Sequence, residues 1–124
     1  TCENNNRNFI TKIIKYEKIC SIPNSMTVLE DFYPIIIDLL KNKTTGTINL
    51  TNPGLISHNE ILELYKKYVD KNFKWKNFTI EEQNNILDSK RSNNYLNTLK
   101  LKNMFPNINH IKKSVENILK KYKI

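Results

Sequence analysis

The stretch "TNPGLISHNEILELYKKY", residues 51–68, combines a turn, a helix start and an apolar stripe. Asn52, Pro53 and Gly54 are typical turn residues. Ser57 is followed three residues later by Glu60, which is a capping box that satisfies two backbone donors at a helix start. Apolar residues then recur at helical spacing, at positions 61, 62, 64, 65, 68 and 69. The stretch therefore predicts a turn followed by a helix with one buried face.

A second helix is predicted for "NSMTVLEDFYPIIIDLLKNK", residues 24–43. Thr27 is its expected N-cap, and Glu30 completes another capping box. Apolar residues follow at helical spacing. Pro34 lies inside this helix and should bend its first turns or delay its regular part, because proline has no N–H to donate.

Two segments are predicted to be short strands. In "GTINLTNPG", residues 46–54, Ile48 and Leu50 should point to the same side before the turn. In "ICSI", residues 19–22, a short apolar run is ended by Pro23. Each strand lies between helical segments, which favours a mixed α/β arrangement.

The remaining helices have recognisable starts. "RNFITKIIKYEK" places apolar residues on one helical face, and Asn6 or Asn8 can cap it. "TIEE", residues 79–82, is a third capping box, and "NINHIKKSVENILKKY", residues 107–122, is the last predicted helix. Together these patterns predict one α/β domain, or one part of a larger protein, that is mostly helical with a few short strands.

The net charge of +8 has two interpretations. A basic surface suits nucleic acid or an anionic ligand. The alternative is the residue usage of an A+T-rich genome, which supplies Lys, Asn, Ile and Tyr. Alanine is absent, and Arg7 and Arg91 are the only arginines. Because the lysines are scattered and specific base readers rely on Arg, composition is the favoured interpretation, and a basic nucleic-acid-binding module is kept as the alternative.

An aromatic loop bears on the same question. Phe73, Trp75 and Phe78 alternate with lysines in "FKWKNF", and such residues can stack on bases. More often such aromatic side chains hold a loop against its own domain, which is the interpretation favoured here.

Several kinds of site have no support in the sequence. Cys2 and Cys20 have no metal-binding spacing, a disulfide is not expected in a reducing cytosol, and Cys20 is expected to be buried. His58 and His110 have no partner ligands at metal-binding spacing, and His58 is expected to be solvated at its helix start. Two glycines cannot form a dinucleotide-binding or phosphate-binding loop, and no Tyr is followed four residues later by Lys. No catalytic, cofactor or metal site is therefore predicted in this chain, and no apolar run is long enough for a membrane helix.

Five strings occur in order along the chain: "RNFITKI", "IPNSMTVLEDFYPI", "GTINLTNPGLISHNEILELYKKYVD", "FKWKNFTIEEQ" and "RSNNYLNTLKLKNMFP". From about Arg7 to the last helix, they resemble the C-terminal part of the bifunctional nucleotide-rhamnose epimerase/reductases of plants and giant viruses. That family is similar to bacterial dTDP-4-dehydrorhamnose reductase, an extended short-chain dehydrogenase/reductase. The resemblance lies in the exact residues of the helix and its flanks. An amphipathic helix requires only apolar residues at helical spacing, so the pattern alone does not explain the match.

The resemblance implies a function for a larger parent protein. The parent would epimerise C3 and C5 of UDP-4-keto-6-deoxy-glucose and reduce the C4 ketone with NADPH, giving UDP-L-rhamnose. A Rossmann half with the cofactor loop and the Tyr-xxx-Lys pair would precede Thr1 and bind NADPH. Residues 1–124 would be the substrate-side C-terminal domain, inactive alone, which fits a first residue other than Met. The resemblance implies a cytoplasmic protein and leaves open a homodimer of the parent and the choice between UDP and dTDP.

The resemblance also implies site residues near the start of the chain. In "RNFITK", Asn8 is a candidate amide donor and Lys12 a candidate cation beside the phosphates. Asn8 suits the role of helix cap equally well. In "NSMT", Asn24 and Thr27 are candidates for contacts to the nucleotide, although capping is the favoured role of Thr27.

The last candidates lie in "RSNN". Arg91 matches an arginine of the family's late substrate loop, and its planar guanidinium suits a diphosphate. Asn93 is a weaker companion. The family usually has proline before this arginine, where Lys90 stands in this chain, so the path of the loop remains open.

Overall fold

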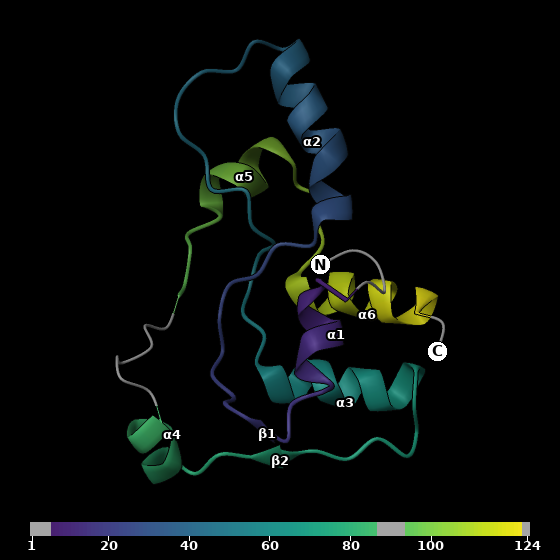
Figure 1. Cartoon of the computed structure of the whole chain (residues 1–124). Helices are drawn as coiled ribbons and strands as arrows, with labels where there is room; N and C mark the ends of the chain where they lie inside the picture. Colours follow the sequence, from purple (N-terminus) through teal and green to yellow (C-terminus); the bar gives the residue numbers. More distant parts are fainter. Residues whose placement is uncertain (1–5, 87–93, 123–124) are drawn as a thin grey trace.

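A computed structural model describes residues 6–86 and 94–122 of the chain, and Figure 1 labels its elements. In chain order these are α1 (Phe9–Ile13), β1 (Lys18–Ile19), α2 (Leu29–Lys41), α3 (His58–Tyr68), β2 (Lys76–Asn77), α4 (Ile80–Ile86), α5 (Leu99–Met104) and α6 (Ile111–Lys121). The two strands are parallel neighbours, with Lys18 opposite Lys76 and Ile19 opposite Asn77. The predicted fold class, mostly helical with a few short strands, is confirmed.

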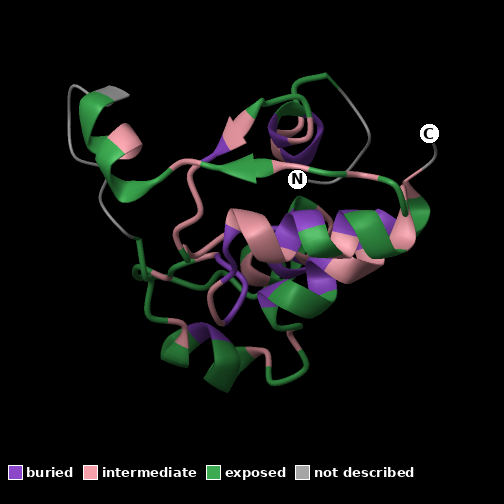
Figure 2. Ribbon diagram, turned by 90° about the horizontal axis from the view of Figure 1, so that it is seen from below, coloured by how far each residue is buried: buried purple, intermediate pink, exposed green. Residues whose placement is uncertain are grey.

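The main core lies where α1, α3 and α6 face one another (Figures 1 and 2). Its buried side chains are Ile10, Ile13, Ile19, Val28, Ile56, Ile61, Leu62, Tyr65, Ile111, Val115, Ile118 and Leu119. The apolar stripe predicted for α3 is confirmed, because Ile61, Leu62 and Tyr65 are buried and the other members pack half-buried against the same core. This core fixes where α1 lies, and α1 carries Lys12 and is capped by Asn8, which are two of the predicted site residues.

A second, smaller core joins α2 to α5 at the opposite end of the molecule from α4 (Figure 1). Phe32 and Ile35 of α2 are buried there with Leu101 of α5. Ile48 and Leu50 pack against this cluster, so the prediction that they point to the same side is confirmed.

Two of the predicted capping boxes are confirmed. The N–H of Glu60 donates to Ser57 Oγ at 3.2 Å, and the N–H of Ser57 donates to Glu60 Oε2 at 3.1 Å. At the start of α4, the N–H of Glu82 donates to Thr79 Oγ1 at 3.1 Å and the N–H of Thr79 donates to Glu82 Oε2 at 2.9 Å. Both boxes are local in sequence, which is why the pattern alone could predict them.

The capping box predicted for Thr27 and Glu30 is wrong. Helix α2 has Val28 as its N-cap residue, which offers no side-chain acceptor. The Thr27 hydroxyl instead donates to the carbonyl of Leu50 at 3.0 Å. The helix is continuous from Leu29 and contains Pro34, so the expected delay of its regular part does not occur either.

The cap of α2 comes from a distant segment. Asn52 is fully buried, and its Oδ1 accepts a hydrogen bond from the N–H of Val28 at 2.8 Å. Its Nδ2 lies within hydrogen-bonding distance of Asp31 Oδ2 at 2.9 Å and Ser114 Oγ at 3.0 Å. The Ser114 hydroxyl also donates to the Asp31 carboxylate. Asn52 therefore ties the turn after Leu50 to both α2 and α6.

The strand predicted for residues 46–54 is also wrong. Within the described residues, this segment contributes to no β-ladder, although the N–H of Asn52 donates to the carbonyl of Met26 at 3.1 Å. A strand requires a hydrogen-bonded neighbour over several residues, and the described part of the chain provides none here. The strand predicted for residues 19–22 overlaps β1 only at Ile19, and β2 was not predicted.

Gly54 is required where the chain bends before α3. Its φ is +88°, and a Cβ there would lie 1.9 Å from Nε2 of His110. His110 Nδ1 accepts a hydrogen bond from the N–H of Lys112 at 3.2 Å at the start of α6. Only glycine fits this backbone conformation and this close approach.

The aromatic loop packs onto its own domain, as the favoured interpretation predicted. The ring centroid of Phe73 lies 5.0 Å from that of Tyr65 and 5.9 Å from that of Trp75. Trp75 Nε1–H donates to Asn59 Oδ1 at 2.9 Å. These contacts bring the chain back alongside β1, where it forms β2 (Figure 1).

Two smaller expectations are corrected. Cys20 is only half-buried, because it follows the buried Ile19 at the end of the short strand. His58 is half-buried rather than solvated, since α1 covers the start of α3 and the Phe9 ring lies edge-on at 5.2 Å. In the described ranges, every helix is too short or too polar to cross a lipid bilayer.

Candidate functional site

The predicted site residues come from three segments that are distant in sequence. Asn8, Lys12, Asn24 and Thr27 lie among the described residues, whereas Arg91 and Asn93 lie outside them. The structure therefore places the first four directly and shows only the chain that follows the last two.

Asn8 caps α1, because its Oδ1 accepts a hydrogen bond from the N–H of Ile10 at 2.8 Å. The capping interpretation is thus confirmed, and a contact from its amide to a sugar nucleotide stays a prediction. Lys12 lies exposed in the last turn of the same helix. Its ammonium group can reach an anion from solvent without breaking a buried contact.

Asn24 holds the chain that follows the "RSNN" segment. Its Oδ1 accepts a hydrogen bond from the N–H of Asn94 at 2.8 Å, and its Nδ2 donates to the carbonyl of Ile22 at 3.1 Å. The neighbouring Ser25 donates its N–H to the carbonyl of Asn94 at 2.7 Å, and its Oγ accepts from the N–H of Leu96 at 2.9 Å. The structure thus brings "NSMT" against the residue next to Asn93, which no local pattern predicted.

Thr27 lies close to the start of α1. Phe9 and Ile10 line a small internal cavity together with Met26, Thr27 and Val28. Two of the predicted segments, "RNFITK" and "NSMT", therefore pack side by side. The hydroxyl of Thr27 is already donated to Leu50, so a ligand contact from it would have to use an oxygen lone pair.

A cleft of about 650 Å³ opens between α1, β1 and the loop after β2. We call it the α1–β1 cleft. It is lined by Phe9, Ile13, Lys15, Tyr16, Glu17, Lys18, Ile19, Cys20, His58 and Phe78. Its walls combine aromatic rings with lysines, a composition that suits a ligand with both a flat ring and negative charge.

The lysines of this cleft differ in their pairing. Lys18 Nζ lies 2.6 Å from Glu82 Oε1 and 5.7 Å from the Phe78 ring centroid. This contact lowers the pKa of the Glu82 carboxyl, chiefly through the hydrogen bond from Lys18. Lys15 is exposed at the cleft edge. The run "KYEK" at residues 15–18 was a sequence signal for this cleft, but His58 and Phe78 are brought to it only by the fold.

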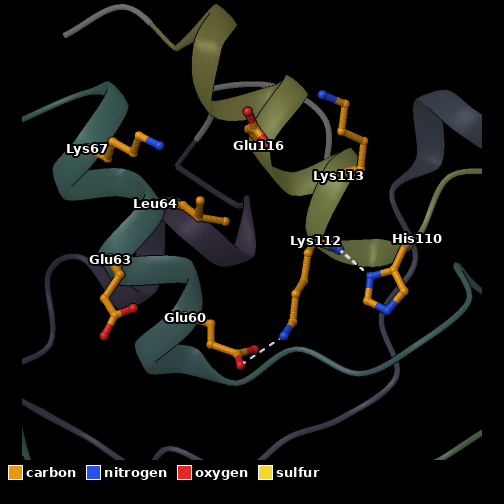
Figure 3. A pocket seen from close by; sticks show the side chains of 8 residues that line it. All are labelled: Glu60, Glu63, Leu64, Lys67, His110, Lys112, Lys113 and Glu116. Atoms are coloured by element: carbon orange, nitrogen blue, oxygen red, sulfur yellow. Dashed lines mark hydrogen bonds and ion pairs between the residues drawn. The ribbon is translucent and has the colours of Figure 1, made fainter.

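A groove of about 590 Å³ also lies between α3 and α6 (Figure 3). Leu64 lies at its centre, with Lys67 and Glu116 facing each other across it. Lys112 Nζ lies 3.2 Å from Glu60 Oε1, and Glu60 also completes the capping box of α3. Because the Lys112–Glu60 ion pair joins α6 to the start of α3, we assign the groove a structural role.

The Glu116 carboxylate in this groove is likewise bound by neighbouring side chains. The Tyr68 hydroxyl donates to Glu116 Oε1 at 2.7 Å, and Lys120 Nζ lies 3.0 Å from the same atom. The hydrogen bond from Tyr68, followed by that from Lys120, lowers the pKa of the Glu116 carboxyl to about 2. The described side chains also include no group of three or more His, Cys, Asp or Glu residues arranged to hold a metal ion.

The chain as a whole is similar to several known proteins. No family model matches the chain. A bifunctional dTDP-4-dehydrorhamnose 3,5-epimerase/dTDP-4-dehydrorhamnose reductase from Arabidopsis thaliana is 55% identical over 111 residues, which cover 90% of this chain and 37% of the plant protein. A trifunctional UDP-glucose 4,6-dehydratase/UDP-4-keto-6-deoxy-D-glucose 3,5-epimerase/UDP-4-keto-L-rhamnose-reductase from the same plant is 53% identical over 112 residues, covering 90% of this chain and 17% of that protein.

A solved structure is also similar. The crystal structure of a UDP-rhamnose synthase from Acanthamoeba polyphaga mimivirus has a TM-score of 0.88 at 50% sequence identity, covering 97% of this chain and 42% of that chain. The chain thus spans less than half the length of the relatives it matches. Over nearly its whole length, the chain is a homologue of the C-terminal part of the nucleotide-rhamnose epimerase/reductases, the family that its sequence resembles.

Proposed function

We propose that this chain is the substrate-side domain, residues 1–124, of an epimerase/reductase that converts UDP-4-keto-6-deoxy-glucose to UDP-L-rhamnose. The similarity to the mimivirus UDP-rhamnose synthase, with a TM-score of 0.88 at 50% identity, is the observation that carries the proposal. NADPH would be bound by an N-terminal Rossmann half and would supply the hydride that reduces the C4 ketone. The task of this domain is to hold the keto-sugar in register with that cofactor.

The nucleotide would lie along α1 and the "NSMT" segment. The exposed Lys12 would contribute positive charge near the diphosphate. The hydrogen bond from the N–H of Asn94 to Asn24 Oδ1 would hold the end of the "RSNN" segment beside the same place. Arg91 would then bind the diphosphate through its guanidinium, with Asn93 as an additional donor.

The α1–β1 cleft would accept the base of the nucleotide. Tyr16 and Phe78 supply ring faces for stacking, and Lys15 supplies a cation at the edge. This assignment can be tested by titrating the chain with UDP. Tyr16→Ser should weaken UDP binding at least about fivefold, because stacking on an aromatic ring contributes roughly 1–3 kcal/mol per base. Tyr33→Ser alters a tyrosine of α2 that is similarly exposed but does not line the cleft, so it should leave the affinity unchanged.

The proposed activity is tested in a chimera in which this chain replaces the matched part of the mimivirus protein. NADPH oxidation is followed with a UDP-4-keto-6-deoxy sugar. The chimera should turn over, and this chain alone should not. A folded chimera without turnover would reject the proposed function.

Arg91 is tested in the same chimera. Arg91→Ala should lower kcat/KM at least about tenfold, because charge-assisted hydrogen bonds contribute about 1.5–3 kcal/mol each. Arg91→Lys should recover little, since an ammonium group cannot reproduce the planar fork. The affinity for NADPH should not change. Lys102→Ala removes an exposed cation of α5, outside the proposed site, and serves as the control.

Nucleic-acid binding receives no support from the comparisons, whose named relatives are enzymes of rhamnose formation. Two of the three aromatic residues that suggested it, Phe73 and Trp75, are packed against the protein core.

A further inference from the structure

One cation of the α1–β1 cleft is held by a carboxylate that does not line the cleft. Lys18 lines the cleft, and its Nζ donates a hydrogen bond to Oε1 of Glu82 on α4 at 2.6 Å. The two side chains are 41% and 39% exposed, so water and salt screen their attraction. An ion pair at such a depth can be exchanged for a pair with another anion.

Glu82 divides its two carboxylate oxygens between two tasks. Oε2 accepts a hydrogen bond from the N–H of Thr79 at 2.9 Å and completes the capping box of α4. Oε1 accepts the hydrogen bond from Lys18. The helix start depends on the first of these bonds only. Lys18 can therefore leave Glu82 without undoing the cap of α4.

The surroundings of Lys18 favour a negatively charged partner. In the β1–β2 ladder Lys18 lies opposite Lys76, and like charges at paired positions repel each other. Its Nζ also lies 5.7 Å from the centroid of Phe78, a ring that we propose for stacking. An anion beside Lys18 relieves the repulsion, and Glu82 supplies that anion in the structure. A phosphate group can take the same place, because lysine binds phosphate as a point charge.

We propose that Glu82 is a built-in competitor of the ligand, and that a phosphate of a nucleoside diphosphate in the α1–β1 cleft takes over the Lys18 ammonium from it. The Lys18–Glu82 ion pair is then an autoinhibitory contact. It lowers the affinity for a nucleoside diphosphate and leaves the affinity for the neutral nucleoside unchanged. This inference rests on the proposed function, because it takes the cleft to be the place of the nucleotide.

The first measurement compares the binding of UDP and of uridine by the wild-type chain and by Glu82→Gln. Glutamine keeps the capping box, since it serves at the third helical position as glutamate does. It removes the negative charge that holds Lys18. Glu82→Gln should bind UDP about threefold more tightly, the size expected for the loss of one half-exposed ion pair. Uridine should bind equally to both proteins. An affinity for UDP that is unchanged or weaker would overturn the proposal, as would a failure of both proteins to bind UDP.

Two control variants separate this contact from a general effect of charge. Glu81→Gln removes the same charge from the neighbouring, exposed position of α4 and should leave the affinity for UDP unchanged. Lys18→Gln should weaken UDP binding, and in that background Glu82→Gln should have no further effect. An equal gain from Glu81→Gln, or a gain from Glu82→Gln that persists without Lys18, would overturn the proposal.

The second measurement follows the Glu82 carboxyl itself. The hydrogen bond from Lys18 is the largest of the causes that lower its pKa below the ordinary value of 4.5. When UDP takes over Lys18, the pKa of Glu82 should rise towards the ordinary value, which NMR of the side-chain carboxyl carbon detects. The Glu116 carboxyl, with a pKa of about 2 in the α3–α6 groove, should not respond to UDP. A pKa of Glu82 that UDP leaves unchanged would overturn the proposal.

Neither measurement depends on turnover, so this inference and the proposed function can fail separately. If UDP displaces Lys18 from Glu82 in the chain and the folded chimera does not turn over, the autoinhibitory contact is kept and the proposed function is rejected. If the chimera turns over and Glu82→Gln gains no affinity for UDP, the proposed function is kept and the autoinhibitory contact is rejected.

Discussion

The side-chain oxygen of Asn52 accepts a hydrogen bond from the N–H of Val28 at 2.8 Å, and 24 residues separate the two. Helix α2 is therefore capped by the turn that precedes α3 rather than by its own sequence. Because Asn52 also contacts Asp31 and Ser114, one buried amide holds α2 and α6 in place.

We expect Asn52→Ala to lower the free energy of unfolding by roughly 2–4 kcal/mol, because it leaves a helix cap and buried polar partners unsatisfied. Urea denaturation measures the change. Asn49→Ala is the control, since Asn49 is exposed and its side chain makes a single hydrogen bond, to the carbonyl of Asn97 at 3.1 Å. A cost below about 1 kcal/mol for Asn52→Ala would contradict the assigned role, because a typical helix cap alone is worth about that much.

Gly54→Ala should destabilise the chain more than Gly46→Ala. Both glycines have positive φ, at +88° and +97°, but the added Cβ meets His110 Nε2 at 1.9 Å in the first case and Lys100 Nζ at 3.4 Å in the second. Gly46→Ala should therefore cost roughly 1–2 kcal/mol for the backbone conformation alone. Gly54→Ala should cost about 1 kcal/mol more, because the His110 ring must leave its capping position.

The excess cost of Gly54→Ala should disappear when His110 is absent. In a His110→Ala background, Gly54→Ala and Gly46→Ala should have equal effects on the free energy of unfolding. An excess that persists there would show that contacts other than the His110 ring require the glycine.

Glu116 should make stability fall in acid. Its folded pKa is about 2, below the ordinary value of 4.5, so the folded state favours the ionised carboxylate. The resulting stabilisation is fully present above the unfolded value and is lost as the pH falls from about 4.5 to about 2. The Glu116→Gln variant should therefore lose less stability than the wild type over this window. Denaturant midpoints at pH 7, 4 and 2.5 test this, and parallel pH profiles would contradict it.

Trp75 should report on the aromatic loop, because it is the only tryptophan. Its indole N–H donates to Asn59 Oδ1 at 2.9 Å, and its ring stacks on Phe73. We expect its fluorescence to be unchanged by a single-stranded oligonucleotide at physiological salt. Any binding by the dispersed lysines should be weak, indifferent to sequence and abolished by salt. Quenching of Trp75 with submicromolar affinity would restore the nucleic-acid hypothesis.

The sequence by itself determined the features that depend on near neighbours. The Ser57–Glu60 and Thr79–Glu82 boxes, the Asn8 cap and the stripe of α3 were all readable, because each involves residues within a few positions of one another. The family resemblance could also be recognised from the sequence, since it lies in the residues of the five quoted segments and in their order along the chain.

Only the tertiary structure decided the features that join distant segments. Three such features join residues that are 20 or more positions apart. Asn52 caps α2, Asn24 accepts a hydrogen bond from the N–H of Asn94, and His58 and Phe78 line the same cleft. For residues 46–54, the sequence pattern correctly predicted that Ile48 and Leu50 point to the same side. It wrongly predicted a strand, because the segment forms no β-ladder within the described residues. A side-chain period is encoded locally, whereas backbone hydrogen bonds of a strand require a neighbour that the local sequence does not contain.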